Sequence, residues 1–269
     1  MKRLFRNSIS IVLVVGIGLM TLSTSCKKKK PAPDLPPSSS MVMSFSNFAS
    51  ASDTVNKSGE TYQNWGHSYA NVVVWNVIIT IGLAVPVASF LESFNHQAVW
   101  DNHDEEWSWT YNVWAGGASH TCRLVASMSG DYIQWKMFIS KQNGFTDFMW
   151  YEGQSHSNGT NGYWTLYESP TVNQQLLQID WNKNSDGTED IKYTNIKPNG
   201  PENGGYIAYG ITSATDFNAF YDIYNKGQDN LTEIDFNTTD RHGRVKDPRK
   251  FGDSDFHCWG TTLADEVCN

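Results

Sequence analysis

Apolar and polar residues alternate in short runs over the C-terminal two thirds of the chain. In the run 107–113, Trp107, Trp109, Tyr111 and Val113 stand at every second position. Successive side chains of a β-strand point to opposite faces of a sheet, so each run presents one apolar and one polar face. The alternation therefore predicts strands, and the content of 11 Trp, 12 Tyr and 13 Phe is typical of them.

Runs of this kind follow one another as far as residue 246, with hairpin signals such as Asn143-Gly144 and Asp186-Gly187 between them. They cover 107–113, 120–126, 133–139, 148–152, 163–168, 176–181, 189–196, 206–211, 217–224, 231–237 and 243–246. Short connections join neighbouring strands, so the pattern predicts a mainly β fold: an antiparallel up-and-down meander of about ten strands. We expect this sheet to curl into a barrel or a half-open barrel.

Residues 72–91 are uncharged and mostly apolar. Their length would suit a membrane span, but Gly82 and Pro86 interrupt the segment and Asn76 and Thr80 lie within it. We expect one buried hydrophobic helix, kinked near Pro86 and packed on or in the curled sheet. A membrane-inserted or surface-docking helix is an alternative, and so is a β-hairpin, because Val and Ile are β-branched.

The N-terminus has the pattern of an export signal. Basic residues at 2, 3 and 6 precede an uncharged stretch at 9–22, and Ser23, Thr24 and Ser25 then lead to Cys26. The stretch is about 14 residues long, which suits a signal peptide and is short for a membrane span. The segment resembles the lipobox of bacterial lipoproteins, although Leu22 stands four residues before the cysteine rather than three.

This resemblance implies that residues 1–25 are a signal peptide and that Cys26 becomes the lipidated first residue, carrying acyl chains such as palmitate. It also implies a lipid-anchored place in the cell envelope, at the outer rather than the inner membrane, because lysine follows the cysteine. Residues 26–40, with four lysines followed by prolines and serines, predict a tether. The lysines would add attraction to anionic lipid headgroups. We expect a single β-rich domain over 41–269.

The charge of the predicted domain narrows the choice of partners. Residues 41–269 contain 13 Lys and Arg against 27 Asp and Glu, a formal charge of −14. Such a surface repels phosphate backbones, which excludes nucleic acid as an expected partner. The expected partners are the lipid membrane, through acylated Cys26, and either a hydrophobic small molecule or an envelope protein.

Three cysteines remain beyond Cys26. Cys258 and Cys268 lie in one short C-terminal segment, and an exported protein can form disulfides. We therefore predict a Cys258–Cys268 bridge with Cys122 as a buried thiol, and a bridge from Cys122 to the tail is the alternative.

Two polar segments have the composition of chemical sites. Asp101, His103, Asp104, Glu105 and Glu106 could supply an acid–base pair or metal ligands, but they lie in a connection where water would solvate them. The segment 182–190 has oxygen ligands spaced as in a calcium loop, but Tyr193 stands where the loop's last Glu is expected, and the segment lies between two predicted strands, so we expect a hairpin turn. The polar tail residues Arg249, Asp253, Asp255 and His257 could line a site, and their convergence with residues 103–106 would favour a hydrolase, but we expect them to close one end of the barrel. We predict no catalytic residue, metal or cofactor.

The apolar faces of the strands offer a different kind of site. Trp107, Trp109, Trp135, Trp164 and Trp181 are candidates to line a cavity for an apolar or aromatic-stacking ligand, and the alternative is an ordinary core. The leading hypothesis is a non-enzymatic, membrane-tethered lipoprotein with a binding or structural role. The alternatives are an envelope hydrolase built on residues 101–106 and a structural partner in an outer-membrane complex.

Overall fold

The computed structural model describes residues 31–48 and 59–268. The predicted signal peptide, Cys26 and the lysines at 27–30 lie outside the described residues. The folded unit is Ala32–Asn269.

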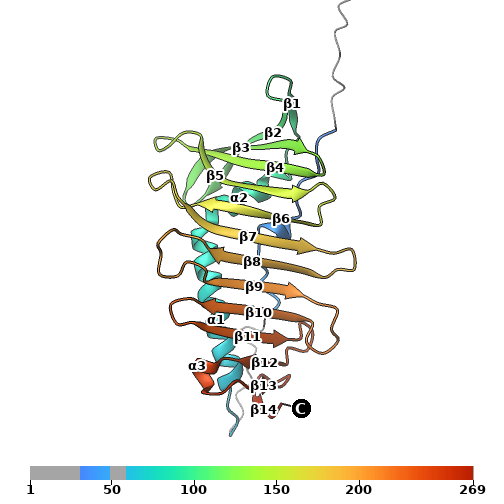
Figure 1. Ribbon diagram of the computed structural model, residues 1–269, viewed down its shortest axis with the longest axis vertical. Helices are drawn as coiled ribbons and strands as arrows, with labels where there is room; N and C mark the ends of the chain where they lie inside the picture. Colours follow the sequence, from blue (N-terminus) through green and yellow to red (C-terminus); the bar gives the residue numbers. More distant parts are fainter. Residues whose placement is uncertain (1–30, 49–58, 269) are drawn as a thin grey trace, which may run out of the picture. The chain divides into compact units, whose positions relative to one another are not determined.

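In the described part of this unit, fourteen strands form one antiparallel sheet in which each strand pairs with the next in the chain (Figure 1). The strands are β1 (Val99–Asp101), β2 (Glu106–Ala115), β3 (Ala118–Ser129), β4 (Tyr132–Lys141), β5 (Phe148–His156), β6 (Asn161–Tyr167), β7 (Gln175–Lys183), β8 (Glu189–Asn195), β9 (Tyr206–Ile211), β10 (Ala219–Asn225), β11 (Asn230–Phe236), β12 (Gly243–Lys246), β13 (His257–Trp259) and β14 (Asp265–Glu266). The mainly β class and the antiparallel meander are confirmed.

The predicted strand number and the predicted barrel are wrong. The alternating runs correspond to β2–β12, but β1, β13 and β14 have only two or three residues each, too few for alternation to reveal them. The sheet is open, because the strand order runs from β1 to β14 without pairing these two end strands. A barrel would require its first and last strands to meet, whereas here helices and an N-terminal segment cover the apolar face instead.

The hydrophobic segment forms two helices rather than the single kinked helix predicted. α1 (Gln63–Gly82) and α2 (Ala84–Ser93) meet at Leu83 with a bend of 70°. The bend lies one turn before Pro86, because a proline ring clashes with the carbonyl four residues earlier, here that of Gly82. Taken singly, neither helix is long and apolar enough to cross a membrane, although the bent pair together has sufficient length and composition.

α1 is also less buried than predicted. Trp65, Val72 and Ile79 pack into the core, but Val74, Val77, Ile78 and Ile81 are between 50 and 74% exposed. The helix crosses the strands on one face of the sheet, so only the side turned toward the strands is covered (Figure 1).

The C-terminal part of the predicted tether packs into the folded unit. Pro36 and Ser40 are buried, and Ser38–Ser40 form a short 3-10 helix, η1, against the sheet. Buried tyrosines then hold the following residues: the Tyr193 hydroxyl donates to the Met41 carbonyl (2.8 Å), and the Tyr221 hydroxyl donates to the Ser44 carbonyl (2.5 Å). The proline-rich composition did not reveal this packing because the partners lie more than 120 residues away.

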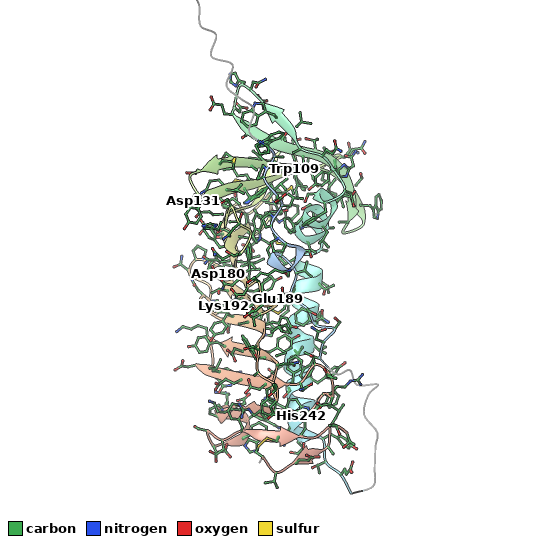
Figure 2. All side chains as sticks on the ribbon, turned by 90° about the vertical axis from the view of Figure 1, so that its right-hand side faces the viewer. Trp109, Asp131, Asp180, Glu189, Lys192 and His242 are labelled. Carbon is green, nitrogen blue, oxygen red and sulfur yellow. A yellow bond between two sulfur atoms is a disulfide. The ribbon has the colours of Figure 1, made fainter. Side chains whose placement is uncertain are left out.

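Large aromatic side chains fill the core, which lies on one face of the sheet. Figure 2 shows Trp109 on the side that the helices cover, whereas Asp180 and Lys192 lie on the opposite side. Glycines stand opposite three of the buried indoles, in the pairs Gly153–Trp164, Gly162–Trp181 and Gly243–Trp259. Each glycine leaves room for the ring across from it, because a Cβ there would collide with that ring.

We predict that Gly153→Ala lowers the free energy of unfolding by about 1–3 kcal/mol, as overpacking does in a well-filled core. The new Cβ would lie 2.6 Å from Trp164 Cε3 and in contact with the Tyr163 carbonyl oxygen. Urea unfolding measures the loss. Gly66→Ala in α1 is the matched control, since its Cβ meets no atom within 4 Å and it should stabilise the helix slightly. Equal effects of the two changes would contradict this packing.

Candidate ligand-binding groove

A groove of about 590 Å³ runs between α1 and the sheet. Val74, Trp75 and Ile78 of α1 form one wall. Leu176 and Leu177 of β7 and Ile223 of β10 belong to the other side, so the middle of the groove is apolar. Its volume lies in the range of small-molecule sites, which are commonly concave and apolar with a few polar groups.

The sequence of α1 explains why this wall is open to solvent. Val74, Ile78 and Ile81 follow one another at helical spacing and lie on one face of α1, with exposed fractions of 57, 54 and 74%. A contiguous apolar stripe of this kind is uncommon on a soluble surface, and it commonly marks a site that binds something. Val74 and Ile78 of this stripe line the groove, whereas Ile81 lies outside its lining.

Polar residues gather at the end of the groove nearest the start of α1. Asp247 is 5% exposed and accepts from His67 Nε2 (2.7 Å), Asn230 Nδ2 (2.8 Å) and Thr232 Oγ1 (2.8 Å). It also caps the short helix α3 (Pro248–Phe251) by accepting from the first backbone amides of that helix. One carboxylate thus joins α1, β11 and α3 at this point.

The contacts of Asp247 set its protonation. Burial alone would raise the pKa of this carboxyl group, but the hydrogen bonds from Asn230, His67, Thr232 and the Lys250 amide hold the pKa below its usual value. The group is therefore a carboxylate at neutral pH.

A second carboxylate fixes the first turn of α1. Asp265 of β14 accepts from the backbone amides of Gln63 (3.0 Å) and Asn64 (2.9 Å), which have no partners within the helix. The Asn64 side chain donates to the carbonyl of Cys258 (2.8 Å). Cys258 is joined to Cys268 by a disulfide, the predicted pair, so the C-terminal strands and the start of α1 form one junction. Cys122 is a buried free thiol, and burial raises its pKa to about 12.

The five candidate tryptophans lie in the core rather than around the groove. Trp107, Trp109, Trp135, Trp164 and Trp181 are each at most 4% exposed, and none of them lines the groove. Two indoles donate to buried serines, Trp135 to Ser155 (2.9 Å) and Trp164 to Ser40 (3.3 Å). Trp181 also borders a smaller hollow of about 250 Å³. This placement corresponds to the alternative interpretation, an ordinary core.

The acidic cluster occupies the exposed connection between β1 and β2. Asp101 accepts from the backbone amides of His103 (2.7 Å) and Asp104 (3.3 Å), which shapes the turn, and the His103 side chain is 93% exposed. His257 is part of β13, near the other end of the sheet, where it contacts Asp253. The structure therefore does not bring the cluster and the tail residues together, and nothing in the turn excludes water as an acid–base site commonly requires.

The calcium-like segment forms the loop between β7 and β8. Asp186 accepts from the amide (3.0 Å) and the hydroxyl (2.7 Å) of Thr188, and these bonds lower its pKa. The Asp186 carboxylate therefore stabilises the hairpin turn. In the ranges 31–48 and 59–268, no group of three His, Cys, Asp or Glu side chains is arranged to hold a metal ion.

One outer-face acid has a strongly shifted pKa. Burial raises the pKa of Asp222 to about 6, and the nearby charges of Glu233 and Asp235 act in the same direction. Asp222 stands directly opposite Glu233 in the β10–β11 register, and Glu233 pairs with Lys246. Burial, together with the like charge of Glu233 in the directly opposed position, explains the raised pKa of Asp222 without a functional site.

Comparison with protein families, with curated proteins and with solved structures finds no match for this chain. The groove is therefore interpreted from its own chemistry. Sequence reasoning missed it because its walls come from distant segments: His67 and Asp247 are 180 positions apart. The hydropathy of 72–91 was the available signal, but it did not show which face of the helix would stay uncovered.

We predict that Asp247→Asn lowers the free energy of unfolding at pH 7 by about 1–3 kcal/mol, because an amide cannot accept all the hydrogen bonds that the carboxylate accepts. The native pKa lies below the unfolded value of about 3.8, so the stabilisation is complete above that pH and is lost as the pH falls through the native pKa. Chemical unfolding of both proteins from pH 7 to pH 2.5 measures this. A difference that stayed constant down to pH 2.5 would contradict the role of the ionised carboxylate.

Proposed function

We propose that this protein is a cell-envelope lipoprotein, acylated at Cys26, whose β-rich unit binds an apolar ligand without catalysing a reaction. The observation that carries the binding role is the groove between α1 and the sheet. Its apolar middle and the exposed stripe at Val74 and Ile78 support a ligand that is itself largely apolar. Burial of such surfaces contributes roughly 25 cal/mol for each Å² removed from water, so the exposed stripe favours an occupant.

The lipid anchor is supported by the N-terminal sequence alone. A basic start, a short apolar stretch and small residues before Cys26 resemble a lipoprotein signal. Two or three acyl chains would hold the protein to a membrane, since each buried methylene contributes about 0.8 kcal/mol. The outer membrane is the proposed location.

We predict that Cys26→Ala abolishes incorporation of labelled palmitate and leaves the protein either unprocessed or released from the membrane fraction. Metabolic labelling and fractionation in a two-membrane bacterium measure both effects. Cys122→Ala is the control, because this thiol is buried in the sheet and the variant should still be labelled. Labelling and membrane retention of Cys26→Ala would refute the proposed anchor.

We predict that Gly82→Trp prevents ligand binding while the protein stays folded. Gly82 lines the groove, and a Cβ there meets no atom within 4 Å, so an indole can enter the groove without displacing the core. Native mass spectrometry of the acylated mature protein would show a lipid-sized non-covalent adduct in the wild type and none in the variant. Gly66→Trp, on the same helix but outside the groove, should keep the adduct. Absence of any adduct in the wild type would refute the binding role.

A second candidate function is a structural role in an envelope complex. Val77 and Ile81 are exposed and do not line the groove, so they favour a partner protein that covers α1 from outside. Co-purification of one envelope protein with the wild type and with Gly82→Trp alike, without a lipid-sized adduct, would support this candidate over ligand binding.

A further inference from the structure

The two ends of the groove differ in charge. Arg249 and Lys250 of α3 line the end near His67, and their side chains are exposed. In the part of the chain that the structure describes, neither side chain forms an ion pair or a hydrogen bond with another residue. Their backbone amides donate to Asp247, which fixes the position of α3 and leaves both cationic groups free for a ligand.

The carboxylate beside these cations is already fully engaged. Asp247 accepts from three side chains and from the two α3 amides, so a ligand does not have to displace it from Arg249 or Lys250. In a region with 27 acidic and 13 basic residues, Arg249 and Lys250 are two adjacent cations that line the same end of the groove. They offer a local attraction for an anion that the rest of the surface repels.

The length of the groove limits the apolar part of the ligand. The lining residues of α1 run from His67 to Gly82, which is about 22 Å at 1.5 Å per residue. The hydrocarbon layer of one membrane leaflet, half of the bilayer core, is about 15 Å thick. A single long acyl chain lying along α1 therefore fits between the polar end and Gly82.

We propose that the ligand of this groove is an anionic amphiphile with a long acyl chain. Its carboxylate or phosphate lies beside Arg249 and Lys250, and its chain runs along α1 between Ile78 and the leucines of β7. This inference rests on the proposed function and specifies its ligand class. Glu202 also lines the groove, and its carboxylate accepts from the Gly227 amide (3.3 Å). Its negative charge favours a headgroup with a single negative charge over a more highly charged one.

The test compares three probes on the acylated mature protein by native mass spectrometry titration: palmitate, hexadecanol and phosphatidylglycerol. Hexadecanol has the same chain length as palmitate without the charge. We expect the double variant R249A/K250A to bind palmitate about tenfold more weakly, as charge-assisted hydrogen bonds to a partly exposed headgroup are lost. Its affinity for hexadecanol should stay unchanged. The control K136A/K141A removes two cations of β4 that lie away from the groove and should bind palmitate as the wild type does.

The outcomes separate this inference from the function on which it rests. If R249A/K250A binds palmitate, hexadecanol and phosphatidylglycerol as the wild type does, the headgroup inference is overturned while apolar binding stands. If no probe binds, or binding is unaffected by Gly82→Trp, the proposed function falls as well. Loss of phosphatidylglycerol binding alone in R249A/K250A identifies the anion as a lipid phosphate, and loss of palmitate binding alone identifies it as a free carboxylate. Either loss supports the inference.

Discussion

An open sheet whose apolar face is made of indoles and phenol rings is stable in water only if another part of the chain covers that face. Here the cover consists of residues 35–48, α1 and α2, which cross the strands on one side. Buried tyrosines hold the first segment through their hydroxyl groups, and carboxylates hold the start of α1. The arrangement of every other element depends on this cover, because no closed barrel shields the core.

The helices cover the apolar face of the sheet incompletely, and the groove lies where this face is left uncovered beside α1. α1 is one helix wide, so its outer side and the strand ends beside it stay accessible, and the apolar stripe through Val74 and Ile78 is left without a partner. At the polar end of the groove, hydrogen bonds to Asp247 connect α1 with α3 and β11. From there toward Gly82, the residues that line the groove are mostly apolar. Because the walls of the groove are already fixed, little side-chain entropy is lost when a ligand binds. This favours the binding of an elongated apolar ligand.

Sequence alternation predicted the strands β2–β12 well, because each has one buried and one solvated face. It could not predict β1, β13 and β14, because two or three residues are too few to show an alternation. Nor could it predict the open sheet, which depends on what covers the core. Hydropathy located the helical region, yet the polar start of α1 at Gln63 was not predicted, because Asp265, which accepts from the Gln63 amide, lies 202 positions later. The disulfide pair followed from cysteine spacing. The five tryptophans were named as candidates because alternation assigns a face to each residue but does not show whether that face lines a cavity or a packed core.

Photo-crosslinking in intact cells tests the central claim most directly. Cells that express the full-length protein would take up a long-chain fatty acid with a diazirine near its methyl end, and peptide mapping would locate the label. We predict label on α1 between Asn71 and Gly82 together with Leu176 or Leu177 across the groove. Label on α1 alone would mean that the exposed stripe faces a membrane rather than enclosing a ligand. That result, or label confined to the outer face of the sheet, would contradict the account.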